Sequence, residues 1–143
     1  MKQEISISWK DGMAFEAEVN GHKLMLDAGE QFGGRDLGPR PKPLMLVALA
    51  GCTAMDVVSI LSKMRVKIDN FDVRVEGEQS EEQPVHYISM HIIYEFWGKD
   101  LPYDKLEKSI ELSQERYCGV SAVYRKAMPV SYSIVVHNTA EIE

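Results

Sequence analysis

A long apolar stretch limits what this chain can fold into more than any other feature of the sequence. The 18 residues from Leu44 to Leu61 contain a single charge, Asp56. This is close to the length of a membrane span, but an aspartate near the centre of a lone span costs roughly 2.5–3.5 kcal/mol on insertion. A helix that is apolar on all sides is also typical of the buried centre of a globular domain. We therefore predict a buried helix over about 44–65 and no membrane association.

The sequence on both sides of this stretch has the alternation of β-strands. Asp11-Gly12 and Asn20-Gly21 are hairpin signals between the first alternating segments. Apolar residues alternate with polar ones in six strand-like segments (Ile5, Ile7, Trp9; Met13, Phe15, Ala17, Val19; Leu24, Leu26; Phe71, Val73, Val75; Ile88, Met90, Ile92, Tyr94, Phe96; Val130, Tyr132, Ile134, Val136). A second, amphipathic helix begins near Pro102, with Leu106, Ile110 and Tyr117 on one stripe. The prediction is an α+β fold with about six antiparallel strands around the long central helix.

Composition narrows the class of protein. The chain has 143 residues, of which 45% are hydrophobic, and no linker or repeat divides it, so we expect one domain over 1–143. Its 16 basic and 22 acidic residues give a net charge of −6, which argues against nucleic acid as a partner. Two cysteines are too few for a disulfide scaffold, and no signal peptide is evident. We therefore expect a cytoplasmic protein with two reduced thiols.

The apolar helix also predicts a partner. One sheet with a solvent-exposed face cannot easily surround a helix that is apolar on all sides. A second copy of the chain can supply the missing cover, so we predict a homodimer with a large interface.

Motifs for metal and nucleotide binding are missing. The four histidines, at positions 22, 86, 91 and 137, do not have the spacing of a metal pair, and neither cysteine has a cysteine or histidine nearby in sequence. No glycine-rich nucleotide-binding pattern occurs. We expect no metal and no bound cofactor.

The two cysteines remain as candidates for chemistry. Cys52 lies inside the apolar helix, where the simplest interpretation is a small buried hydrophobe. However, Gly51 is unfavourable in a helix interior, which suggests that something approaches the backbone there. Asp56 lies one turn from Cys52 on the same face. Three cations in the preceding loop, Arg35, Arg40 and Lys42, are candidates to support a thiolate.

Cys118 has the more favourable local context for an acidic thiol. It is expected to open a short helix, and Arg116 and Arg125 are close in sequence. On local acidity alone, Cys118 is therefore the better nucleophile. Two thiols that meet in the fold would form a reversible disulfide couple.

Two segments resemble the signatures of the OsmC/Ohr family of osmotically inducible and organic hydroperoxide resistance proteins, in its OsmC-like branch. The first runs from Pro39-Arg40-Pro41 through Leu49-Ala50-Gly51-Cys52-Thr53-Ala54-Met55-Asp56, and the second is Tyr117-Cys118-Gly119-Val120-Ser121. The resemblance covers about residues 3–137. It implies an intertwined homodimer with active sites at the subunit interface and thiol-dependent reduction of organic hydroperoxides. It also implies that Cys52 is the peroxidatic cysteine, that Cys118 is the resolving cysteine, and that an external dithiol, lipoyl-linked in some members, restores both thiols.

The sequence departs from the family pattern at two supporting residues. Pro43 stands where the family has a glutamate, and the stretch after the first strand has no arginine. Arg35 or Arg40 is the candidate replacement cation, and Asp56 or Glu115 the candidate replacement anion. We assign substrate binding to Arg35, Arg40 and Asp56.

Two alternatives to a peroxidase stay open. One is a non-catalytic dimer that holds a small apolar ligand at its interface, for which the eight methionines offer an adaptable surface. The other is a purely structural dimer with inert thiols.

Overall fold

The computed structural model of the protein describes residues 1–141, and contacts along the chain divide it into two compact units. The first unit spans residues 1–45 and the second begins at residue 46. The prediction of one domain over 1–143 stays a prediction.

The first unit contains an antiparallel meander in the order β1-β2-β3, with strands β1 (Ser6–Asp11), β2 (Ala14–Val19) and β3 (His22–Leu26). Both predicted hairpin turns are confirmed. Asn20 and Gly21 turn the chain between β2 and β3 with φ values of 51° and 79°, the left-handed region that asparagine and glycine tolerate best.

The loop after β3 is organised around one buried carboxylate. Asp27 accepts hydrogen bonds from the backbone N–H groups of Ala28, Arg35 and Leu37. Burial by itself would raise the pKa of Asp27, but these hydrogen bonds and the charge of Arg35 outweigh it and lower the pKa below the ordinary 3.8. The loop therefore has a fixed course, with a single 3-10 turn at Glu30–Phe32.

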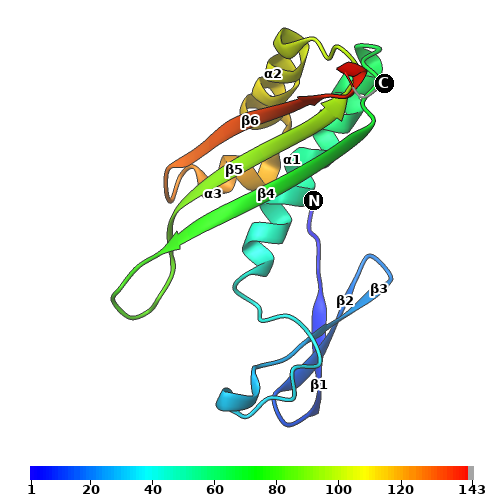
Figure 1. Cartoon of the computed structure of the whole chain (residues 1–143). Coiled ribbons are helices and arrows are strands. Elements are labelled where there is room, and N and C mark those ends of the chain that lie inside the picture. Colours follow the sequence, from blue (N-terminus) through cyan, green and yellow to red (C-terminus); the bar gives the residue numbers. More distant parts are fainter. Residues whose placement is uncertain (142–143) are drawn as a thin grey trace. The chain divides into compact units, whose positions relative to one another are not determined.

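The second unit is built on a three-stranded sheet in the order β4-β5-β6, formed by β4 (Asn70–Gln79), β5 (Tyr87–Gly98) and β6 (Val130–Asn138). Strands β4 and β5 are antiparallel, but β5 and β6 are parallel, so the prediction of six antiparallel strands is wrong for this pair. The reason is the connection between them, a helical crossover that returns the chain to the end of the sheet at which β5 begins (Figure 1).

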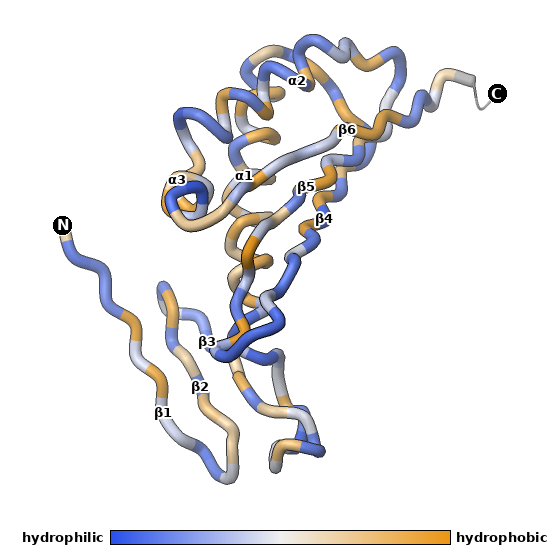
Figure 2. The backbone as a smooth tube through the Cα atoms, turned by 90° about the vertical axis from the view of Figure 1, so that its left-hand side faces the viewer, coloured by the Kyte–Doolittle hydropathy of each residue, from blue (hydrophilic) through white to orange (hydrophobic). Residues whose placement is uncertain are grey.

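Four helical segments of this unit lie on one face of the sheet: α1 (Leu44–Lys63), α2 (Tyr103–Leu112), a π-helical turn (Ser113–Tyr117) and α3 (Gly119–Tyr124) (Figures 1 and 2). A short 3-10 helix (Thr139–Glu141) follows β6. The central helix is confirmed within two residues of its predicted end. Leu106 and Ile110 are buried as predicted, but Tyr117 is 58% exposed. The π-helical turn changes the helical phase before residue 117, so the predicted stripe is wrong at this position.

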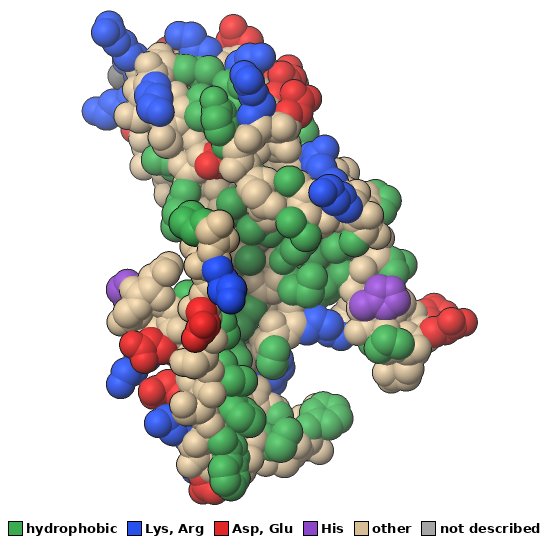
Figure 3. All heavy atoms as spheres, turned by 180° about the vertical axis from the view of Figure 1, so that it is seen from behind, with side chains coloured by type: hydrophobic (Ala, Val, Ile, Leu, Met, Phe, Trp, Pro, Cys, Tyr) green, Lys and Arg blue, Asp and Glu red, His purple; other side chains and the backbone are tan. Residues whose placement is uncertain are grey.

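Helix α1 is buried along one stripe only. Leu49, Thr53, Val57 and Leu61, four residues apart, face the sheet and are at most 1% exposed. On other faces, Val47, Met55 and Val58 are 62%, 76% and 49% exposed. Apolar side chains are accordingly visible over the helical side of the molecule (Figure 3). By length and composition α1 is apolar enough to cross a membrane, but its buried stripe packs in the core of an α+β unit.

Gly51 lies on the exposed side of α1, between Val47 and Met55 at four-residue spacing. Beyond the two adjacent residues and the backbone of the surrounding helical turns, a Cβ atom added to Gly51 would have no neighbouring atom within 4 Å among the described residues. The expectation of a close approach at Gly51 is therefore wrong within one chain.

Candidate active site

The two cysteines meet beside an aspartate on the helical side of the second unit. The Cys52 and Cys118 sulfurs and a carboxylate oxygen of Asp56 all lie within 4.8 Å of one another. Cys52 and Asp56 are one turn apart on α1, so they share a face. Cys118 reaches them from the end of the π-helical turn, where its N–H donates to the Ser113 carbonyl at 2.7 Å. The site therefore depends on one wide helical turn that ends at the second cysteine.

A buried chain of hydroxyl groups leads to Asp56. Tyr94 shares a hydrogen bond of 2.6 Å with Thr53, and Thr53 shares one of 2.8 Å with Ser113. The Ser113 hydroxyl donates to Asp56 at 2.9 Å. Because each hydroxyl has one proton, Ser113 must accept from Thr53, and Thr53 must accept from Tyr94. The chain is therefore oriented toward the carboxylate, which acts as its final acceptor.

Gln114 joins this chain to a cation. Its Nε2 donates to Thr53 at 3.1 Å and to Tyr94 at 2.9 Å, while its Oε1 accepts from Ser121 at 2.6 Å and from Arg125 at 2.9 Å. Every buried side-chain nitrogen and oxygen among the described residues has a partner. A fully satisfied buried network of this kind rigidifies its surroundings. It therefore holds the π-helical turn, and with it Cys118, against α1.

Burial controls the acidity of Cys118. The side chain is 3% exposed, and this burial is the largest cause of a raised pKa. The hydrogen bond to Cys52 and the negative charges of Cys52 and Asp56 raise the pKa further, and the Ser121 N–H, 3.3 Å from the sulfur, only partly compensates. The prediction that Cys118 is an acidic thiol is therefore wrong. Arg125, on which it partly relied, donates instead to Ser121 and Gln114.

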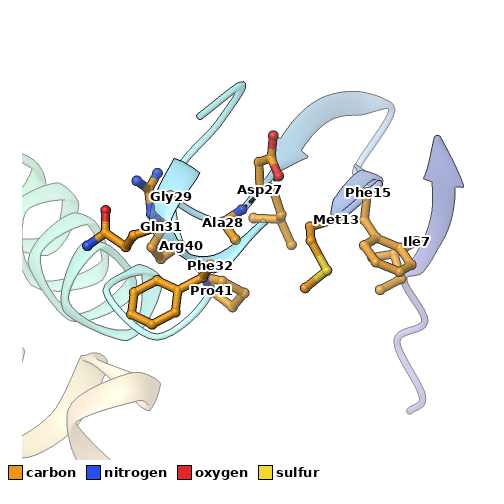
Figure 4. Close-up of a pocket in the computed structure, with 11 residues that line it drawn as sticks. Ile7, Met13, Phe15, Asp27, Ala28, Gly29, Gln31, Phe32, Arg40 and Pro41 are labelled. Carbon is orange, nitrogen blue, oxygen red and sulfur yellow. Dashed lines mark hydrogen bonds between the residues drawn. The ribbon is translucent and has the colours of Figure 1, made fainter. Parts of the chain in front are cut away.

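The other predicted site residues divide between the two units. Asp56 lies beside both sulfurs, whereas Glu115 is exposed, so Asp56 is the better candidate anion. Arg35 and Arg40 belong to the first unit, and their support of Cys52 stays a prediction. There Arg40 pairs with Asp36 and lines an apolar hollow of about 470 Å³ together with residues that include Met13 and Phe32 (Figure 4).

A second hollow of about 530 Å³ opens next to Asp56. Its wall is mostly apolar with one cation, formed by Ser59, Ile60, Lys63, Met64, Leu112 and Tyr117. A ligand with an apolar body and one polar end therefore fits beside Asp56.

The sequence analysis missed the network residues Thr53, Ser113, Gln114 and Ser121, and it assigned Tyr94 to the core only. One signal was available, because a buried tyrosine hydroxyl needs a hydrogen-bond partner. Thr53 is such a partner, one of the few polar residues in a mostly apolar helix. Burial raises the pKa of Tyr94 to about 12, so its hydroxyl keeps the proton that starts the chain.

Thr53→Val tests the network. Valine keeps the shape of threonine but lacks the hydroxyl group that bonds to both Tyr94 and Ser113. Each of these two residues therefore loses a buried hydrogen-bond partner. We expect the free energy of unfolding to fall by roughly 1–3 kcal/mol, measured by urea denaturation at an unchanged m-value. The matched control is Thr139→Val, whose hydroxyl makes an exposed hydrogen bond to Asp69 and whose loss should cost little. Equal effects of the two substitutions would contradict the role of Thr53.

Comparison with known proteins gives a consistent result. A family model described as OsmC-like protein matches residues 33–133, which include both cysteines. The protein YhfA of Escherichia coli K12 is 31% identical over 131 residues, which cover 91% of this chain and 95% of YhfA.

Solved structures share the fold. An OsmC-like protein of unknown function from Vibrio cholerae superposes with a TM-score of 0.76 at 18% identity, over 94% of this chain and all of that one. An organic hydroperoxide resistance protein from Elizabethkingia anophelis superposes with a TM-score of 0.66 at 12% identity, over 97% of this chain and 99% of that one. At these identities the likeness shows the fold alone.

Proposed function

The chain belongs to the family of OsmC-like proteins, and from this premise we propose that it is a thiol peroxidase that reduces organic hydroperoxides to alcohols. The observation that carries the proposal is the convergence of the two sulfurs within 4.8 Å. Related structures named as organic hydroperoxide resistance proteins share this fold and support the substrate class.

The proposed cycle has three balanced steps. The Cys52 thiolate attacks the terminal peroxide oxygen, the O–O bond breaks, and the alkoxide takes up a proton and leaves as the alcohol; Cys52 is then a sulfenic acid. The Cys118 thiol condenses with it, releasing water and forming the Cys52–Cys118 disulfide. An external dithiol, in our proposal lipoyl-linked, reduces the disulfide to two thiols and is itself oxidised to a disulfide.

The different burial of the two thiols supports these roles. Cys52 is half-buried, so a substrate can reach it, while Cys118 is enclosed and kept protonated by burial and by Cys52. The hollow beside Asp56 offers an apolar surface for the organic part of the substrate. We assign Asp56, Arg35 and Arg40 to substrate binding, with the arginines in place of the arginine that the family carries after the first strand.

We further propose that the protein works as a homodimer in the cytoplasm. The exposed apolar side chains of α1 need cover, and the open space at Gly51 allows a helix of a second copy to approach closely. The cycle starts from two free thiols, which the cytoplasm keeps reduced.

Stoichiometric oxidation tests the proposal directly. We expect the reduced protein, mixed with one equivalent of cumene hydroperoxide, to lose both thiols, to release one equivalent of cumyl alcohol, and to give a peptide map in which Cys52 is linked to Cys118. Dihydrolipoamide, the dithiol form, should restore both thiols and be oxidised to lipoamide. If the thiols survive a large excess of hydroperoxide, the peroxidase proposal is wrong, and the hollow beside Asp56 favours the alternative of a protein that binds a small apolar ligand.

A further inference from the structure

We propose that the reduced site also binds one zinc ion through the Cys52 and Cys118 sulfurs and a carboxylate oxygen of Asp56. Zinc binding does not depend on peroxidase activity, although it gives a second role to the same three groups. The sequence alone gave no reason to expect it, because Cys118 is far from the other two ligands along the chain.

The donor set fits zinc. Thiolate sulfur and carboxylate oxygen are both common zinc ligands, and two thiolates with one carboxylate outweigh the charge of the ion. Softer donors of this kind favour zinc over magnesium or calcium, which prefer oxygen alone. The three donors also come from two rigid elements, α1 and the end of the π-helical turn, so binding would not require a loop to fold around the ion.

The spacing fits as well. Two sulfurs that are each about 2.3 Å from a tetrahedral zinc ion lie roughly 3.8 Å apart. The donor atoms of Cys52, Asp56 and Cys118 lie within 4.8 Å of one another, so each pair needs to close by at most about an ångström. Zinc binding requires that rotation of the three side chains supplies this closure.

Neighbouring groups orient the donors. Ser113 donates to one oxygen of the Asp56 carboxylate, and the Ser121 N–H points at the Cys118 sulfur. Outer groups of this kind fix the orientation of metal ligands and are often worth 10–100-fold in affinity. The hollow beside Asp56 gives access to the site and room for a water molecule as a fourth ligand.

Zinc binding and peroxide reduction compete for the same sulfurs, because a thiolate bound to zinc has donated an electron pair to the metal and is a weaker nucleophile than a free thiolate. Zinc would therefore inhibit the proposed reaction reversibly and would protect the thiols from over-oxidation.

Calorimetric titration of the reduced, metal-free protein with zinc chloride tests the inference. We expect one ion per chain. Asp56→Asn should weaken zinc binding by about tenfold or more and Ser113→Ala by about tenfold, whereas Asp72→Asn, an exposed acid on β4, should change nothing. Cobalt(II) should give the intense sulfur-to-metal absorption of a thiolate site, and Cys52→Ser or Cys118→Ser should remove it. The unmutated protein should also lose this absorption when Cys52 is capped by methyl methanethiosulfonate. It should regain the absorption when a dithiol removes the cap.

Two results would overturn the inference: zinc binding that is equally strong in Asp56→Asn and in the wild type, or a cobalt spectrum without sulfur absorption. The peroxidase proposal fails separately, because stoichiometric oxidation is measured in the presence of a chelator. A protein that is oxidised but binds no zinc refutes only this inference, and one that binds zinc but resists hydroperoxide refutes only the peroxidase.

Discussion

Cys52→Ser is expected to lower dithiol-dependent turnover of cumene hydroperoxide by at least about a thousandfold, as removal of a nucleophile does in other enzymes. A serine hydroxyl is not ionised near neutral pH and does not attack peroxide oxygen, so no sulfenic acid forms. The measurement is the initial rate of hydroperoxide consumption with lipoamide and its reductase in excess.

Cys118→Ser is the matched control, because it removes the other sulfur of the same site with the same substitution. This variant should consume one equivalent of hydroperoxide per chain and then slow by roughly tenfold or more, since resolution now depends on an external thiol. The sulfenic acid on Cys52 should be trapped by dimedone. If Cys118→Ser is inert and Cys52→Ser shows the single turnover, the assigned roles are reversed.

Met55→Asp is expected to dissociate the proposed homodimer. Met55 is 76% exposed in the single chain, in the middle of the apolar face of α1 that we expect the second copy to cover. An unpaired carboxylate buried there costs roughly 3–5 kcal/mol, which raises the dimer dissociation constant by at least about a hundredfold. Sedimentation equilibrium of the reduced protein measures this constant.

The control for the dimer experiment is Ile88→Asp, which places the same charge at another exposed apolar residue of the second unit. Ile88 is 45% exposed on β5, outside α1 in the sequence, and its replacement should leave the dissociation constant within a few-fold of the wild type. A wild-type protein that is monomeric at micromolar concentration, or a Met55→Asp variant that dimerises normally, would refute the homodimer.

Local sequence signals correctly predicted the elements whose hydrogen bonds join residues that are close together in the sequence. The hairpin at Asn20-Gly21 and the helix from Leu44 were predicted correctly, because turn conformation and helical hydrogen bonds involve residues at most a few positions apart. Alternation does not distinguish parallel from antiparallel strands, since both have a period of two residues. The direction of β6 beside β5 therefore followed only from the crossover.

The apolar helix also shows what local sequence patterns leave undetermined. Its composition predicted that every face needs cover, and the structure shows which stripe one chain covers by itself: Leu49, Thr53, Val57 and Leu61. The exposed opposite face with Gly51 could not be assigned from hydropathy, because apolar residues occur on both faces.

For chemistry, the sequence by itself determined which atoms are available: two thiols and an aspartate one turn from the first. The tertiary structure alone decided that Cys118 meets Cys52 and Asp56, and that burial raises the pKa of the Cys118 thiol. The physical reason is that burial and electrostatic interactions depend on distance in space, and the groups that surround Cys118 are dispersed along the chain.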